Sequence, residues 1–209
     1  MQCMIGNRKL YMEIKEESGL RFGFPKENTV VKFDDTAFYR DYFNKLPEAK
    51  GVDFISLEKD AISMIEVKNC MGHEGENRWR IEPNNHKKET SHTTVGLDGR
   101  DSLDIEVAQK TAMTLSALIG AKTYENSKEC VKEVEEIIHF LCSESFSDVA
   151  KQKYIILFLE GNFECHSRSK KMIMRSLQDS LKRKLSWLNC KVSVVDSDTY
   201  DRRRFEIVN

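Results

Sequence analysis

Long apolar runs are absent from this sequence. The longest are Tyr154–Leu159 and Leu115–Ile119, and both fall far short of the roughly 18–20 residues that a membrane-spanning helix requires. The first nine residues contain no apolar stretch of the kind found in secretory signals. We therefore expect a protein with no membrane partner and a cytoplasmic location.

Paired cysteines are also lacking. The six cysteines are scattered, with no CxxC pair, at Cys3, Cys70, Cys130, Cys142, Cys165 and Cys190. In a cytosolic chain this pattern predicts reduced thiols, several of them buried. The alternative is a zinc site in which Cys70 and His73, in C-x-x-H spacing, are joined by His86 and His92. Those two histidines lie in a polar segment that supplies no partner cysteine pair.

Several nucleotide-binding signatures are missing as well. The chain has no Gly-rich phosphate loop of the GxxxxGK[ST] kind, which excludes an ATP motor of that type. It also has no helix-turn-helix, zinc-finger or RNA-recognition signature. Sequence-specific recognition of a nucleic acid is therefore not predicted.

The composition is that of a folded protein. Of the 209 residues, 40% are hydrophobic and 32% are charged, and the formal net charge is −1. These values support a hydrophobic core and argue against disorder along the whole chain. We expect a single domain with N-terminal strands in 1–35, a core in 36–165, and a basic helix with closing strands in 166–209.

Hydrophobic periodicity predicts alternating strands and helices. The expected strands are 10–14, 29–33, 51–57, 61–68, 154–159, 191–195 and 205–208. The expected helices are 36–46, 101–120, 127–142 and 167–188. Residues 71–100 are expected to form a long loop with a short strand at 79–81. This order predicts an α/β (α+β) fold, a central mixed β-sheet flanked by helices.

The clearest local feature is a hairpin that carries three charged residues. If Lys59 and Asp60 form the turn, paired residues sum to 119, and Asp53 lies opposite Glu66. Opposed residues have Cβ atoms about 4.5–5.5 Å apart. Glu66 and Lys68 point to the same face because side chains alternate along a strand. Two carboxylates and one ammonium group are therefore expected to converge.

Two carboxylates this close repel each other, and a divalent cation removes the conflict. Mg²⁺ or Mn²⁺ prefers oxygen ligands and commonly binds through one or two carboxylates. We expect the metal ligands to be Asp53, Glu66 and the backbone carbonyl of Val67. Lys68 would orient or deprotonate a water, or stabilise charge on a phosphate. The alternative is that these charges form only the solvated face of an amphipathic hairpin.

The spacing of these residues resembles that of a known superfamily. Asp53, twelve intervening residues and Glu66-Val-Lys68, within Gly51-Val-Asp-Phe-Ile and Ile65-Glu-Val-Lys-Asn69, are similar to the PD-(D/E)XK nucleases, in particular their uncharacterised bacterial members. The resemblance implies a restriction-endonuclease-like fold in which Asp53 and Glu66 bind Mg²⁺ and Lys68 assists the attacking water. It therefore implies a Mg²⁺-dependent nuclease acting on DNA, in defence or repair.

Other site residues are less well defined by the pattern. Many members of that superfamily supply a further acid from the preceding helix, and Asp35 and Asp41 are the candidates here. A polar side chain from the following helix often reaches the site, which points to Lys110, beside Gln109. Solvent exposure is the alternative for each of these residues.

The net charge hides an asymmetry that bears on partners. Residues 125–148 hold seven acids and two lysines, whereas residues 166–191 hold eight Lys or Arg and one acid, Asp179. The basic segment could follow DNA phosphates; the alternative is an ordinary solvated helix face. A catalytically inactive module that binds nucleic acid or protein is the competing function. The oligomeric state stays open, with a homodimer as one option.

Overall fold

The structure is a computed structural model that describes residues 12–85, 101–124, 129–164 and 168–208. Its centre is a five-stranded mixed sheet in the order β3-β4-β5-β6-β7. The strands are β3 (Thr29–Lys32), β4 (Phe54–Glu58), β5 (Ala61–Asn69), β6 (Gln152–Glu160) and β7 (Lys191–Val195). Neighbours from β3 to β5 are antiparallel, and those from β5 to β7 are parallel. The expected fold class is confirmed.

The hairpin formed by β4 and β5 has the expected register. Phe54 pairs with Ile65 and Glu58 pairs with Ala61, so paired residues sum to 119 with Lys59 and Asp60 at the turn. Beyond Ile65, β5 continues to Asn69, alongside β6. The last four residues of β5 therefore have a strand partner on one side only.

A second, three-stranded antiparallel sheet packs on one face of the central sheet. It consists of β1 (Met12–Glu17), β2 (Leu20–Pro25) and β8 (Glu206–Ile207), in the order β1-β2-β8. Strand β2 was not expected from the sequence, although its alternate residues Phe22 and Phe24 are fully buried. Both contact a core of aromatic rings between the two sheets, which includes Phe54, Phe158 and Phe205.

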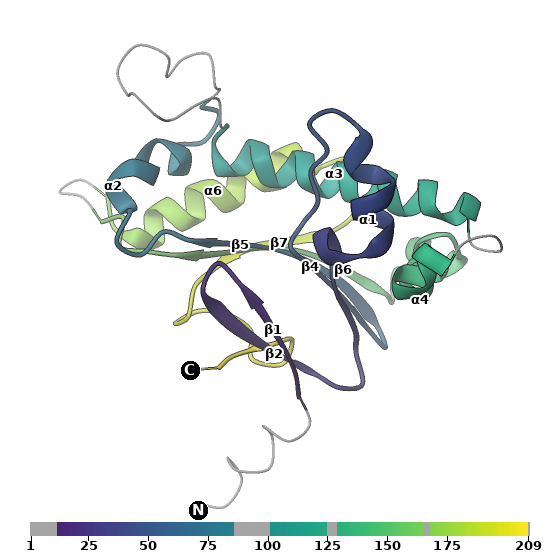
Figure 1. Ribbon diagram of the computed structural model, residues 1–209. Helices are drawn as coiled ribbons and strands as arrows, with labels where there is room; N and C mark the ends of the chain where they lie inside the picture. The colour runs from purple at the N-terminus through teal and green to yellow at the C-terminus, as the bar shows by residue number, and fades with distance from the viewer. Residues whose placement is uncertain (1–11, 86–100, 125–128, 165–167, 209) are drawn as a thin grey trace, which may run out of the picture.

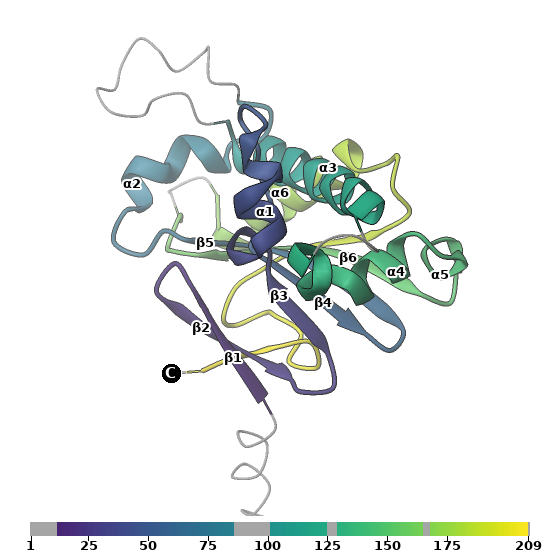
Figure 2. The ribbon, with the colours of Figure 1, turned by 45° about the vertical axis from the view of Figure 1, so that its right-hand side comes forward.

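Helices cover the opposite face of the central sheet, as Figures 1 and 2 show. The helices are α1 (Ala37–Asp41), α2 (Glu74–Asn77), α3 (Leu103–Ala121), α4 (Glu135–Leu141), α5 (Glu144–Ser147) and α6 (Lys170–Lys184). Helices α3 and α6 lie side by side above the sheet, while the β1–β2 hairpin lies below it. None of the helices within the described residues has the length and apolar character needed to span a bilayer.

Four expected elements differ in the structure. The helix expected over 36–46 is only α1, because Tyr42 leaves the helical conformation (φ −125°) and a 3-10 turn, Phe43–Lys45, follows. The helix expected over 127–142 is a 3-10 turn, Glu129–Val134, before it becomes α4. The strand expected at 79–81 is wrong: Arg78–Ile81 is a 3-10 turn after α2. Helix α2 also lies within the loop expected over 71–100, so that expectation is wrong for residues 74–77. Residues 86–100 of the expected loop lie outside the described residues.

The alternation of β5 decides which core each side chain meets. Ile62 and Met64 pack into the core beneath the helices, whereas Ile65 and Val67 pack into the aromatic core. Glu66 is in phase with Met64, so its side chain points toward the helices. The charged groups of the hairpin therefore lie between the central sheet and α3.

Candidate active site

The candidate site lies at the start of β4, beside the residues of β5 after Ile65, which no longer pair with β4. Asp53 directly precedes β4. Its Oδ2 accepts a hydrogen bond of 2.6 Å from the backbone N–H of Val67. The Asp53 carboxylate thus satisfies a backbone donor that has no strand partner on that side. The N–H and C=O of one strand residue point to the same side, so the Val67 carbonyl also faces Asp53.

Two lysines meet the Glu66 carboxylate from different elements. The Nζ of Lys68, on the same strand, lies 2.8 Å from Glu66 Oε1. The Nζ of Lys110, on α3, lies 2.7 Å from Glu66 Oε1 and 3.6 Å from Asp53 Oδ1. The structure therefore brings together Asp53, Glu66, Lys68 and Lys110, which the sequence had nominated separately.

Two further residues complete the cluster and were missed from the sequence. Glu106 Oε1 lies 3.1 Å from Lys68 Nζ, and its Oε2 accepts a hydrogen bond from the Arg80 guanidinium. Glu106 stands four residues before Lys110, which places both on one face of α3, and that spacing was a usable signal. Arg80 carried no signal, because its segment was expected to be a loop or short strand.

Burial and charge set the protonation of the cluster. Glu66 is fully buried and Asp53 is 8% exposed. Burial, together with the Glu66 charge, raises the pKa of Asp53 to about 7. Burial opposes the charge on Glu106, yet Lys68 and Arg80 lower its pKa to about 2. Burial likewise disfavours charged Lys68, but Glu66 and Glu106 hold its pKa above the ordinary value.

Three buried side-chain atoms of the described residues lack a hydrogen-bond partner: Glu66 Oε2, Trp79 Nε1 and Arg80 Nε. The carboxylate oxygen among them indicates how the site fits a metal. Within the described residues, Glu66 Oε2 is buried and forms no hydrogen bond. An orphaned carboxylate oxygen in a buried site is costly, and a hard divalent cation would satisfy it. The donor set of Asp53, Glu66 and the Val67 carbonyl consists entirely of oxygen, as Mg²⁺ and Mn²⁺ prefer. The residues present therefore fit such an ion.

This donor set contains only two carboxylates. No group of three or more His, Cys, Asp or Glu side chains with metal-site geometry occurs in the described part of the chain. Mg²⁺ commonly binds to one or two protein carboxylates and completes its coordination with water or substrate phosphates. Two acids and a carbonyl are thus sufficient for this class of ion.

Other nominated residues lie apart from the cluster. Asp35 and Asp41 are both exposed, and Asp35 pairs with Lys32 at 3.6 Å. The Gln109 side chain contacts Lys50 at 3.5 Å. Neither acid from the segment around α1 therefore contacts the Asp53 carboxylate.

The structure also describes part of the nominated zinc site. Cys70 is a buried free thiol whose pKa is raised by burial, and the His73 ring lies 3.5 Å from Glu76. His86 and His92 lie outside the described residues, as do Cys3 and Cys165. The other described cysteines, Cys130, Cys142 and Cys190, are also free thiols.

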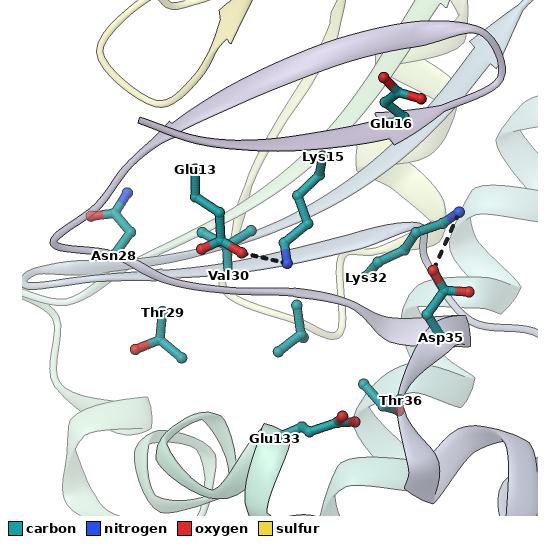
Figure 3. Close-up of a pocket in the computed structure, with 11 residues that line it drawn as sticks. Glu13, Lys15, Glu16, Asn28, Thr29, Val30, Lys32, Asp35, Thr36 and Glu133 are labelled. Carbon is teal, nitrogen blue, oxygen red and sulfur yellow. Dashed lines mark ion pairs between the residues drawn. The ribbon is translucent and has the colours of Figure 1, made fainter. Parts of the chain in front are cut away.

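A separate concave surface lies beside the N-terminal strands. A groove of about 630 Å³ runs between β1 and β3 and has Glu133 on its helical side. Four of its charged side chains form two ion pairs within the groove, Lys15 with Glu13 at 2.6 Å and Lys32 with Asp35, as Figure 3 shows. Glu133 accepts a hydrogen bond from the backbone N–H of Ala37. We therefore give more weight to the buried cluster, where a carboxylate oxygen lacks a partner.

Comparison with known proteins places the chain in a family. Residues 36–209 match the model of a family of unknown function, DUF6661, and the chain belongs to that family. The matched region includes every residue of the candidate site: Asp53, Glu66, Lys68, Arg80, Glu106 and Lys110. No curated protein and no solved structure matches the chain.

Proposed function

We propose that this protein is a metal-dependent hydrolase of phosphodiester bonds, with DNA as its substrate. The observation that carries the proposal is the buried pair of Asp53 and Glu66, with one oxygen of Glu66 unpartnered and Lys68 2.8 Å from the other. Carboxylates in such a site require a compensating charge. The resemblance to PD-(D/E)XK nucleases supports the same conclusion from the sequence.

The residues divide into ligands and a charge-stabilising group. Asp53, Glu66 and the Val67 carbonyl would hold one Mg²⁺ or Mn²⁺. When bound, such an ion supplies a Lewis acid for the phosphodiester and lowers the pKa of a coordinated water. Lys68 stays protonated because its pKa is raised, which favours a role as a hydrogen-bond donor to developing phosphate charge over a role as a base.

The exposed face of α6 suits a polyanionic substrate. Lys170 is engaged by Asp196 at 2.6 Å and Lys184 by Asp104 at 2.7 Å. The exposed cations of α6 that have no ion pair within the described residues are Lys171, Arg175, Lys182 and Arg183. Unpaired surface cations can neutralise phosphates and release counterions. These four side chains therefore support a nucleic acid as the partner.

Metal binding is the first test of this proposal. Isothermal titration with Mn²⁺ should show a site that Asp53→Ala and Glu66→Ala both lose. Asp41→Asn, which removes an exposed acid on α1, is the matched control and should bind Mn²⁺ as the wild type does. Unchanged affinity in both site variants would place any metal elsewhere.

Cleavage is the second test. Supercoiled plasmid and single-stranded oligonucleotides should be cut in the presence of Mg²⁺ or Mn²⁺, and Glu66→Gln should abolish the cutting while Asp41→Asn retains it. The proposal fails if the wild-type protein cuts none of these substrates, or if Glu66→Gln cuts them equally well.

A non-catalytic binding module is the second candidate. One observation favours it: Glu66 Oε1 already has two ammonium partners, Lys68 and Lys110, so the chain itself supplies part of the compensating charge. In that case wild type and Glu66→Gln would bind an oligonucleotide equally and neither would cut it.

A further inference from the structure

Lys110 has a position in the cluster that no other described side chain shares. Its Nζ lies 2.7 Å from Glu66 Oε1 and 3.6 Å from Asp53 Oδ1. It is thus the one ammonium group in the described residues that contacts both carboxylates of the candidate metal site. Because Nζ contacts both carboxylates, its charge lies close to where a cation between them would lie, and the side chain is only 14% exposed.

Lys68 is held differently. Its Nζ pairs with Glu66 at 2.8 Å and also with Glu106 at 3.1 Å. If Glu66 were engaged by another cation, Lys68 would keep Glu106 as its partner. Lys110 would lose the partners of both of its ion pairs at once, because these are the same two carboxylates.

We propose that Lys110 is a resident counter-ion, which a divalent cation displaces and which then binds a phosphate oxygen of the substrate. This inference rests on the proposed function. The long, flexible lysine stem permits such a movement without a change in the backbone of α3. The role differs from that of Lys68, which keeps its ion pair with Glu106 when the cation binds.

The charge of the cluster supports the second half of the proposal. When Asp53 is ionised, as metal binding requires, Asp53, Glu66 and Glu106 carry three formal negative charges, and Lys68, Lys110 and Arg80 carry three positive ones. The cluster is therefore formally neutral with Lys110 in place. A divalent cation brings it to a formal charge of +2, which a pair of phosphodiester anions would neutralise. Metal and substrate are thus expected to bind with positive coupling, and the coupling is reciprocal.

Lysine labelling tests the displacement directly. The wild-type protein is acetylated with acetic anhydride, with and without Mn²⁺, and each lysine is quantified by mass spectrometry. Mn²⁺ should raise the labelling of Lys110 several-fold. Lys59, exposed at the β4–β5 turn, is the internal control and should not change. If Mn²⁺ binds at Asp53 and Glu66 but Lys110 labelling stays constant or falls, the displacement is overturned while the proposed metal site stands.

Titration of Lys110→Met with Mn²⁺ gives an independent readout. Without the competing ammonium, Mn²⁺ should bind roughly tenfold more tightly, a difference of about 1.4 kcal/mol. Lys50→Met is the matched control: it removes one positive charge beside α3, where Lys50 contacts Gln109, but frees neither carboxylate. Equal affinities in wild type and Lys110→Met would overturn the inference. Absence of binding in both proteins would overturn the proposed function as well.

The substrate half is tested with a phosphorothioate oligonucleotide as the probe. In the wild type, saturating Mn²⁺ should strengthen oligonucleotide binding. In Lys110→Met the gain should be several-fold smaller, although Mn²⁺ itself binds more tightly. An equal gain in the two proteins would show that Lys110 does not bind the phosphate, and would overturn this half of the proposal.

Discussion

The Asp53 carboxylate accepts a hydrogen bond of 2.6 Å from the backbone N–H of Val67. This bond continues the contact between the two hairpin strands beyond Phe54 and Ile65, the last pair of the β4–β5 ladder. It holds the Asp53 carboxylate, which is only 8% exposed, on the side of the hairpin where Glu66 lies opposite. The backbone thus fixes two acids near each other, and their repulsion contributes to the raised pKa of Asp53.

The first prediction concerns the pH dependence of stability in the metal-free protein. The folded-state pKa of Asp53 is about 7, against an ordinary value of 3.8. Between these values the folded protein keeps a proton that the unfolded chain has lost, so this group lowers stability as pH rises. Asp53→Asn has no titrating carboxyl group at this position, so it lacks this loss of stability. The free energy of unfolding of Asp53→Asn, relative to that of the wild type, should therefore grow by about 2–3 kcal/mol from pH 5 to pH 8, at 1.36 kcal/mol per pKa unit.

Urea unfolding at several pH values, with a chelator present, measures this difference. Asp60→Asn is the control, since Asp60 is exposed at the β4–β5 turn and Lys151 lowers its pKa. That variant should not gain stability with rising pH. A difference between Asp53→Asn and wild type that stays constant from pH 5 to pH 8 would contradict the raised pKa.

The second prediction concerns Lys68 and catalysis. Lys68→Ala should keep much of the metal affinity, because lysine is not a ligand. Its turnover of DNA should fall by roughly 10²–10³, or about 3–4 kcal/mol, as for the loss of other preorganised transition-state donors. Lys68→Arg should rescue only partly, since the guanidinium is larger and presents a different donor geometry. The measurement is plasmid and oligonucleotide cleavage alongside Mn²⁺ titration.

Circular dichroism of Lys68→Ala serves as the control for folding. Equal cleavage rates in wild type and Lys68→Ala would assign the activity to another site or to a contaminant. A loss of Mn²⁺ binding equal to that in Glu66→Ala would instead mean that Lys68 maintains the metal site itself.

The sequence predicted the part of this structure that depends on local pattern. The alternation of 61–68, with a two-residue turn before it, was sufficient to give the register that places Asp53 near Glu66. Strand β2 was missed because Gly23 and Pro25 are residue types that usually mark turns. In the structure, Gly23 lies within the β1–β2 ladder, opposite Ile14. Tertiary packing of Phe22 and Phe24 outweighed the local signal there.

The candidate site was only partly predictable for a related reason. Lys110 could be nominated from its place on the helix after the hairpin, and Glu106 could have been found from its i, i+4 spacing to Lys110. Arg80 could not, because its contact with Glu106 joins two segments 26 residues apart. Such contacts depend on how the short turn Arg78–Ile81 packs, which no local pattern specifies.

The third prediction concerns the buried pair of Glu106 and Arg80. Arg80 is 4% exposed, so Glu106→Gln leaves a buried guanidinium without its carboxylate. Removal of one partner from a buried pair typically costs about 3–5 kcal/mol. The double variant Glu106→Gln/Arg80→Met should lose less stability than the sum of the single variants, since no uncompensated charge remains. Urea unfolding at pH 7 provides the four free energies of the cycle.

An exposed pair within the same chain supplies the comparison. Lys132 and Glu129 are 2.6 Å apart, with side chains 65% and 83% exposed. Glu129→Gln should change the free energy of unfolding by no more than about 1 kcal/mol. If the single variants at Glu106 and Arg80 are strictly additive, the pair is not coupled and the contact does not hold the cluster together.

The last prediction concerns Gly51, two residues before Asp53. A Cβ at this position would lie 2.5 Å from Cδ1 of Phe33, whose ring is fully buried and cannot move aside. Gly51→Ala should therefore displace the chain that leads into Asp53. Overpacking of this kind costs about 1–3 kcal/mol, and the shift of Asp53 should weaken Mn²⁺ binding in the same variant.

Gly120→Ala is the matched substitution, because a Cβ there meets no atom within 4 Å. Gly120 lies in the last turn of α3, so alanine should stabilise the protein by about 0.5–1 kcal/mol and leave Mn²⁺ binding unchanged. Thermal unfolding and Mn²⁺ titration of the two variants decide the matter. If Gly51→Ala is as stable as wild type and binds Mn²⁺ equally well, the close approach of Phe33 does not position Asp53.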